Sequence, residues 1–315
     1  GAGSTNAIVW LDEDRDGDLD IFELNQSAPN RLLRNESGTF VDDTPVDLVV
    51  AGGTRACAWA DYDDDGDLDV FLIQDSGQNR LLRNDGIAGY VDASPPAISN
   101  GTPEAVGAWG DFDNDGDLDL YGNQFGLLRN EGGVLTEEQM QPPVAGSLSL
   151  TSASWADYDT DGDLDLLITG EEGVVDPPLQ LVRNDLFNGN HWLRVRLAGG
   201  LSNKSAIGAR VRLVASGKIQ YRDVAPLAST GHQAHSVLHF GLGTTTEVDT
   251  LEVRWPSGII NRYTQGLGID RLLVVGESQG GATGVHGLGA VPKGHRLHYA
   301  APNPFNPMTT IRFDL

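Results

Sequence analysis

The sequence of 315 residues has a single cysteine and no apolar run of the roughly 18 residues needed to cross a bilayer. One cysteine cannot form an internal disulfide, and the neighbours of Cys57 favour a buried structural thiol over a nucleophile. The sequence also lacks the Gly-x-Ser-x-Gly, His-Glu-x-x-His and phosphate-loop motifs. A disulfide scaffold is therefore excluded, and no familiar catalytic motif supports an enzyme.

Basic residues are scarce in one part of the chain. Lysine and arginine total 21 against 45 acidic residues, a formal net charge of −24. Residues 1–189 hold 38 acidic and 8 basic residues, whereas residues 190–277 hold 10 basic and 6 acidic residues. Because so acidic a surface repels nucleic acid and anionic membranes, we expect neither as a partner.

One acidic segment, Asp-x-Asp-x-Asp-Gly-Asp-Leu-Asp, occurs four times, with starts 49, 50 and 46 residues apart. The four copies, called loops 1 to 4 below, span residues 12–20, 61–69, 111–119 and 157–165. Five carboxylates in nine residues repel one another, and a hard cation with oxygen ligands at about 2.3–2.6 Å relieves that repulsion. Glycine at the sixth position permits a sharp turn. The pattern predicts about four calcium ions, one for each loop.

Loop 1 also fits the EF-hand pattern, because Glu23 stands at the twelfth position. The same position is Leu72, Gly122 and Ile168 in the other loops, and none of these side chains can bind calcium. The flanking segments are β-prone and show no amphipathic helices. We therefore interpret the EF-hand match as accidental.

The loops belong to a longer repeat. A tryptophan lies two residues before each loop, and short β-prone segments separated by Gly, Asn and Asp follow it. One of these segments carries Asn-Arg-Leu-Leu-Arg-Asn at residues 30–35 and 79–84, and a shortened form at 127–130 and 181–184. Four strands in such a period are typical of a propeller blade. We expect four blades, at about residues 1–49, 50–99, 100–146 and 147–189. The fourth has no clear outer strand. We also expect a larger propeller whose earlier blades lie upstream of this sequence.

Across residues 1–189 these motifs resemble the FG-GAP/VCBS repeats of integrin-α-like propellers. The resemblance implies ligation by side chains at loop positions 1, 3, 5 and 9 and by the backbone carbonyl at position 7, whose own carboxylate faces water. With the carbonyl residue given last in each set, the implied ligands are Asp12, Asp14, Asp16, Asp20 and Asp18; Asp61, Asp63, Asp65, Asp69 and Asp67; Asp111, Asp113, Asp115, Asp119 and Asp117; Asp157, Asp159, Asp161, Asp165 and Asp163.

Residues 190–277 alternate apolar and charged side chains, which predicts antiparallel sheets in a sandwich or barrel. The segments 206–211, 238–243 and 253–258 resemble the ASPIC/UnbV domain, which commonly follows such repeats in proteins similar to cartilage acidic protein. Three histidines invite a zinc interpretation, but on a strand residues three apart point to opposite faces. We expect no zinc site at His232, His235 and His239.

The C-terminal part predicts export. Residues 278–298 are rich in glycine and indicate a flexible linker. Residues 299–315 resemble the start of a type IX secretion C-terminal sorting domain or a FlgD-like immunoglobulin module. That resemblance implies a bacterial protein exported to the cell surface or the medium. The first residues resemble neither a start nor a signal peptide, so we expect the true N-terminus upstream.

These expectations favour a secreted or surface-attached adhesion protein that binds an extracellular protein or carbohydrate, with calcium clamping the blades. Two alternatives stay open. One is a polysaccharide-active enzyme or its accessory subunit, for which Glu104, Glu137 and Glu138 are free acids; the other is a purely structural surface protein. We expect no catalytic residues and no cofactor besides calcium.

Overall fold

The computed structural model describes most of the chain: residues 4–50, 53–99, 106–138, 150–170, 179–225, 237–279, 297–301 and 310–313. The described residues form strands and two short 3₁₀ turns, Val46–Leu48 and Gly86–Ala88, which confirms the predicted all-β class. No helix in these ranges is long and apolar enough to cross a membrane.

Four antiparallel sheets follow one another along the chain, each made of consecutive strands. The first three have four strands each: β1 (Thr5–Leu11), β2 (Asp20–Asn25), β3 (Arg31–Glu36) and β4 (Thr39–Asp42); β5 (Thr54–Ala60), β6 (Asp69–Gln74), β7 (Arg80–Asn84) and β8 (Tyr90–Asp92); β9 (Gly107–Gly110), β10 (Asp119–Gly122), β11 (Gly126–Asn130) and β12 (Leu135–Glu137). The fourth has three strands among the described residues, as expected: β13 (Leu150–Ala156), β14 (Asp165–Gly170) and β15 (Leu179–Val182).

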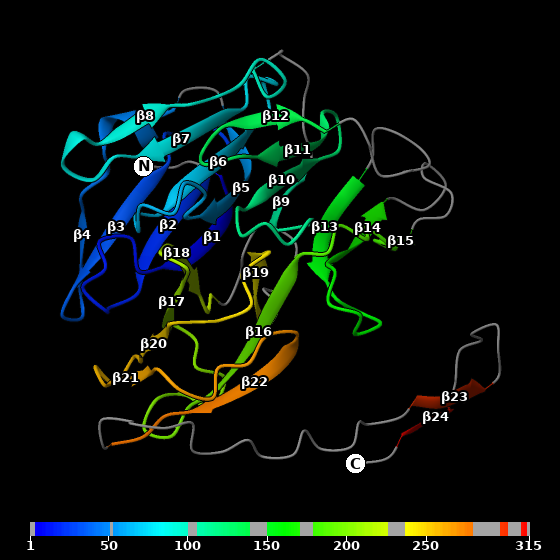
Figure 1. Cartoon of the computed structure of the whole chain (residues 1–315). Helices are drawn as coiled ribbons and strands as arrows, with labels where there is room; N and C mark the ends of the chain where they lie inside the picture. The colour runs from blue at the N-terminus through cyan, green and yellow to red at the C-terminus, as the bar shows by residue number, and fades with distance from the viewer. Residues whose placement is uncertain are drawn as a thin grey trace.

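The four sheets are arranged as consecutive propeller blades (Figure 1). Their first strands lie side by side, with β1 next to β5, β5 next to β9 and β9 next to β13. The described residues show no comparable packing between β1 and β13, so the blades form an open arc. Each acidic loop joins the first strand of its blade to the second. All four loops therefore lie on the same side of the row of blades.

Apolar residues between the blades hold the arc together. The central strand β6 is buried over its whole length because another blade covers each of its faces. Three of the four tryptophans before the loops lie between blades, as predicted: Trp59 packs edge-on against Phe22, Trp109 Nε1 donates to Ala58 O at 3.2 Å and Trp155 Nε1 donates to Ala108 O at 3.1 Å. Trp10 is exposed and contacts Phe40 of its own blade. The hydrogen bonds of Trp109 and Trp155 cross from one blade to the next, so each of these two indoles fastens its blade to the preceding one.

The second domain is a sandwich of two sheets around one core (Figure 1). Trp255, the largest fully buried side chain of the described residues, lies in that core and donates to Asn261 Oδ1 at 2.9 Å. In spatial order the two sheets contain β19 (Val237–Gly243), β16 (His191–Ala198) and β22 (Arg271–Gly276); and β18 (Lys218–Asp223), β17 (Arg210–Ala215), β20 (Thr250–Arg254) and β21 (Ile260–Tyr263).

One strand pair differs from the predicted antiparallel sheets. Strands β16 and β22 run parallel, with Val195 opposite Leu273. A parallel pair needs a long crossover connection, and here the intervening strands β17 to β21 provide it. The alternation of apolar and polar residues could not reveal the parallel pairing, because a strand shows the same alternation whether its neighbour runs parallel or antiparallel.

The last described strands are β23 (Leu297–Ala301) and β24 (Thr310–Phe313), which pair antiparallel. Strand β24 and residues 299–301 of β23 lie in the segment that resembles the start of a further module, whereas residues 297 and 298 were expected in the linker. His232 and His235 lie outside the described residues, whereas His239 belongs to β19. Its Nε2 lies 2.6 Å from Asn114 Oδ1 in loop 3, a contact with an amide oxygen of the propeller.

Candidate metal centre

The four acidic loops share one backbone conformation. Position 4 has a positive φ in every loop although none of these residues is glycine, and the glycine at position 6 has φ between 97° and 104°. The residues concerned are Arg15, Asp64, Asn114 and Thr160 at position 4, and Gly17, Gly66, Gly116 and Gly162 at position 6. Because a side chain is strained at such φ values, glycine at position 6 serves the turn itself. Four sequences with different intervening residues therefore form the same loop.

The aspartate at position 9 anchors each loop to its blade. Asp20, Asp69, Asp119 and Asp165 are all about 1% exposed or less, and each accepts two backbone hydrogen bonds of 2.8–3.0 Å. One donor is the residue at position 2, and the other is the asparagine that ends the third-strand motif. A carboxylate has about four acceptor sites, so two remain for another ligand.

Position 3 accepts the N–H of position 5, and position 5 accepts the N–H of position 7. These bonds turn the carboxylates toward the inside of the loop. In each loop three carboxylates offer oxygen atoms that all lie within 4.8 Å of one another. The groups are Asp12, Asp14 and Asp20; Asp61, Asp63 and Asp69; Asp111, Asp113 and Asp115; Asp157, Asp159 and Asp165.

The structure thus brings together twelve of the twenty predicted residues. Position 5 joins the group only in loop 3, and position 9 joins it in the other three. The expectation that position-7 carboxylates face water holds for Asp18, which is exposed. It is wrong for the other three: Asp67 pairs with Arg15, Asp117 with Lys218 Nζ at 2.6 Å, and Asp163 accepts from Asn114 Nδ2 at 2.8 Å. Their neighbours come from other loops or from the second domain, which the local sequence could not reveal.

One arginine of each blade also contacts its loop, and sequence reasoning missed this role. It is the second arginine of the Asn-Arg-Leu-Leu-Arg-Asn motif, which had been interpreted only as a strand marker. Its contacts with the position-3 carboxylate measure 3.9, 3.7, 2.8 and 3.2 Å in loops 1 to 4, made by Arg34, Arg83, Arg129 and Arg183. The sequence did contain a signal for this role, because an arginine recurs at the same position after every acidic loop.

The electrostatics of the loops favour an additional positive charge. Burial, followed by the charge of Asp64, raises the pKa of Asp61 to about 7. Burial likewise raises the pKa of Asp69 and that of Asp111 to about 8, and holds the pKa of Asp119 well above its ordinary value. A bound dication removes the penalty of keeping such carboxylates ionised.

The lack of polar partners is clearest for the carboxylate of Asp61. It is 2% exposed, and neither of its carboxylate oxygens has a hydrogen-bond partner. The nearest cation, Arg210 Nη2, is 3.6 Å away from Oδ2. Because a buried carboxylate without a partner is costly, the donor set of loop 2 fits a group with several open ligand positions. Oxygen-only donors match a hard dication such as calcium or magnesium.

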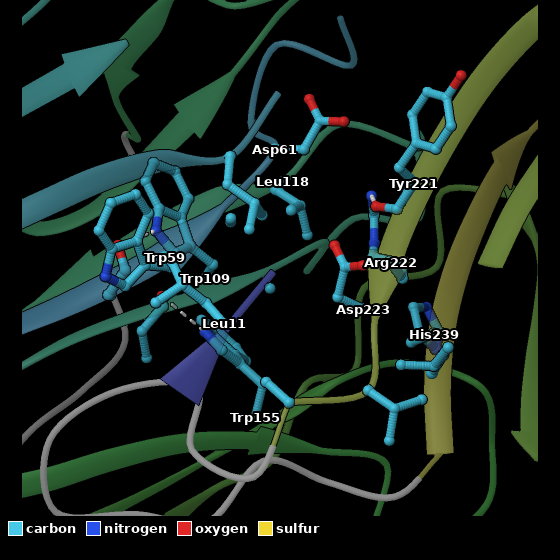
Figure 2. Close-up of a pocket in the computed structure, with 18 of the residues that line it drawn as sticks. Leu11, Trp59, Asp61, Trp109, Leu118, Trp155, Tyr221, Arg222, Asp223 and His239 are labelled. Carbon is cyan, nitrogen blue, oxygen red and sulfur yellow. Dashed lines mark hydrogen bonds between the residues drawn. The ribbon is translucent and has the colours of Figure 1, made fainter. Parts of the chain in front are cut away.

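A cavity of about 230 Å³ lies beside the loops, between the first strands of the blades and the second domain. Figure 2 shows Trp59, Trp109 and Trp155 on one side and Tyr221, Arg222 and His239 on the other. The first aspartate of every loop also lines it. The first aspartate of each loop therefore lies where the two domains meet.

Comparison with protein families supports both predicted resemblances. The FG-GAP-like repeat family matches residues 12–72 and 61–122, and the family described as ASPIC and UnbV matches residues 199–282. Loop 4 lies outside the first match, yet its backbone is the same as in the matched loops. Both resemblances are confirmed; the matched residues do not include the predicted sorting domain.

Two solved structures resemble the chain weakly. The crystal structure of the V. cholerae biofilm matrix protein Bap1 shares 13% identity at a TM-score of 0.38, over 81% of this chain and 47% of that chain. The crystal structure of BBS1N in complex with ARL6DN shares 12% identity at a TM-score of 0.24, over 81% and 90%. The present chain thus spans about half the length of the Bap1 chain. Comparison with curated proteins finds no match.

Proposed function

We propose that this chain, which joins FG-GAP-like repeats to an ASPIC and UnbV domain, is an extracellular binding protein whose propeller is stabilised by calcium. The observation that carries the proposal is the fourfold repetition of one carboxylate cluster on one backbone conformation. Calcium is the preferred cation because it accepts six to eight oxygen ligands in flexible geometry, including backbone carbonyls. Bound calcium would supply the positive charge that the buried carboxylates lack.

The protein's own residues have defined tasks in this proposal. The aspartates at positions 1 and 3 would bind calcium in every loop, joined by position 9 in loops 1, 2 and 4 and by position 5 in loop 3. The position-9 aspartate also ties the loop to the asparagine after the third strand. Each occupied loop therefore holds the first three strands of its blade in one geometry.

We place the partner-binding surface away from the acidic loops. The second domain already contacts all four loops and occupies much of that side of the propeller. In the part of the chain that the structure describes, the second domain lies below the blades and away from the outer strands β4, β8 and β12 (Figure 1). An extracellular protein or carbohydrate is the partner class that the repeat family suggests, in an adhesive rather than catalytic role. Export by type IX secretion remains part of the proposal, on the resemblance of residues 299–315.

Thermal unfolding in calcium and in EDTA tests the metal assignment. Calcium should raise the Tm, EDTA should lower it, and added calcium should restore it, whereas magnesium at the same concentration should restore it less. An unchanged Tm in EDTA would refute a stabilising metal. A glycan array combined with a hydrolysis assay then separates binding from turnover; release of sugar products would support the enzyme alternative.

A further inference from the structure

The second domain presents basic side chains to every acidic loop. Loop 2 also receives Arg222, whose Nη1 lies 3.8 Å from Asp64 Oδ1, but four side chains make the closest polar contacts, one with each loop. The four come from four different strands, and loops 1 to 4 receive Arg254 of β20, Arg210 of β17, Lys218 of β18 and Arg194 of β16. Residues 190–277 carry a net positive charge and residues 1–189 a strongly negative one. The contact therefore joins complementary surfaces at the positions where the negative charge is densest.

Each of these side chains makes close polar contacts. Arg194 Nη1 lies 2.5 Å from Asp157 Oδ2, and Lys218 Nζ lies 2.6 Å from Asp117 Oδ1. Arg210 Nη2 donates to the carbonyl of Gly66 at 2.5 Å. Arg254 donates to the carbonyls of residues 15 and 16 of loop 1, at 2.7 and 2.8 Å. The side chains of Arg194 and Arg210 are only 13% and 12% exposed, so water screens these charges little.

An edge strand of the second domain also pairs with loop 3. Strand β19 is at the edge of its sheet, and the N–H groups on that side need acceptors. Gly241 N donates to Asp111 Oδ2 at 3.0 Å, and Gly243 N donates to Asn114 O at 2.8 Å. The fit is close, since a Cβ built on Gly241 would lie 2.1 Å from Asp111 Oδ2. Propeller and second domain are thus matched in shape as well as in charge.

The contacts leave room for a metal ion. In loops 3 and 4 the second domain binds the same oxygen of the first aspartate that the loop glycine already binds. For Asp111 this oxygen accepts Gly116 N and Gly241 N, and for Asp157 it accepts Gly162 N and Arg194. The other oxygen of each carboxylate has no contact with the described part of the second domain. Nor do the carboxylates at positions 3, 5 and 9 contact those residues.

The negative charge of loop 4 can accommodate both calcium and the basic side chain of the second domain. Loop 4 has five carboxylates, of which a calcium ion and Arg183 would offset three charges. Arg194 offsets a fourth. A metal-free loop leaves an excess of negative charge whose repulsion loosens the surface on which the second domain lies. Without the second domain, Asp157 Oδ2 loses its contact with Arg194 and keeps the N–H of Gly162.

We propose that the second domain is a docking partner of the metal-loaded loops, and that calcium binding and docking strengthen each other. The inference rests on the calcium sites proposed above. Because coupling between two binding events is reciprocal, a change that weakens docking must weaken calcium binding by the same factor. The second domain would then act as a lid that calcium holds against the propeller.

Calorimetric calcium titration of the full chain tests this coupling. The test variant combines Arg194→Glu with Arg210→Glu, and the matched control combines Arg196→Glu with Lys204→Glu. Both control residues are exposed basic residues of the second domain that form no ion pair with a described residue. We expect the test variant to bind calcium at least about tenfold more weakly than the parent, within the usual range of such couplings, and the control to match the parent.

Hydrogen exchange reports docking separately from calcium binding. The amides of Gly241 and Gly243 should exchange at least about tenfold faster in EDTA than in calcium, and faster in the test variant than in the control. If the charge reversals unfold the chain, the milder double variant Arg194→Gln with Arg210→Gln replaces them. It should likewise weaken calcium binding and speed the exchange of the two glycine amides. Normal calcium binding by the test variant, or tighter binding, would overturn the coupling while the calcium proposal stands. A parent chain that binds no calcium would overturn both.

Discussion

Chelation should reverse the pH dependence of stability between pH 5 and pH 8. Without a metal, burial holds the pKa of Asp61 at about 7 and the pKa values of Asp69 and Asp111 at about 8. In the unfolded chain these groups titrate near about 3.9. The folded chelated protein therefore binds more protons than the unfolded chain in this range, and its stability falls as the pH rises.

The magnitude follows from the linkage relation. A carboxyl whose pKa is about 7 when folded and about 3.9 when unfolded removes about 2 kcal/mol of stability between pH 5 and pH 7. At about 2.1 cal/mol/K of unfolding entropy per residue, that corresponds to about 3 °C in Tm for a chain of 315 residues. Asp69 and Asp111 act in the same direction. The carboxylates whose pKa is lowered, such as Asp42 and Glu277, lose their contribution only in more acidic solution.

His239 opposes this trend. Burial, followed by the charges of Arg222 and Arg194, lowers its pKa to about 3. The folded protein then keeps His239 neutral while the unfolded chain gains a proton below about pH 6.5, so this residue destabilises the protein in acid. Because His239 is present with and without calcium, the difference between the two conditions removes its contribution.

The pH dependence of stability is measured as the Tm at pH 5, 6, 7 and 8, once in calcium and once in EDTA. In calcium, acid protonates the ligands and releases the metal, so the Tm should fall as the pH falls. In EDTA the Tm should rise as the pH falls from 8 to 5, and the gap between the two curves should close. Parallel curves would refute the assignment of the buried aspartates as metal ligands.

Three further predictions concern single residues. Asp61→Asn should reduce bound calcium by one ion per chain, whereas Asp75→Asn, outside the loops, should leave it unchanged; equilibrium dialysis counts both. Gly116→Ala should cost more stability than Gly38→Ala by roughly 1–3 kcal/mol, because both have positive φ but only the Cβ at Gly116 would come within 3.0–3.1 Å of second-domain atoms; equal calorimetric losses would contradict the interface. Cys57 is fully buried, and burial raises its pKa to about 12, so thiol reagents should react with it only after unfolding.

The loops were predictable because their chemistry is local. Carboxylate spacing, the glycine at position 6 and the tryptophan two residues earlier all lie within about a dozen residues, and the period of the repeat gave the blades. The exposed Asp18 follows the expected pattern, because no neighbour reaches it. The role of Arg129 was also predictable in principle, because an arginine recurs at the same position of the repeat after every loop.

The contact between the domains was not predictable in this way. Arg210 and Gly66 are separated by 144 residues, and Arg254 and Arg15 by 239. The alternation in the second domain indicates which side chains leave its core, but it cannot indicate what they meet. The same limit explains the parallel pairing of β16 and β22, since strand direction depends on the path of the intervening chain.

Calcium stoichiometry tests the central claim most directly. The full chain is dialysed against millimolar calcium, since extracellular modules bind with Kd on the order of 10⁻⁴–10⁻³ M, and bound metal is counted by elemental analysis. The four carboxylate clusters predict about four calcium ions per chain, with none retained after EDTA. A folded chain that binds fewer than one calcium ion under these conditions would contradict the account.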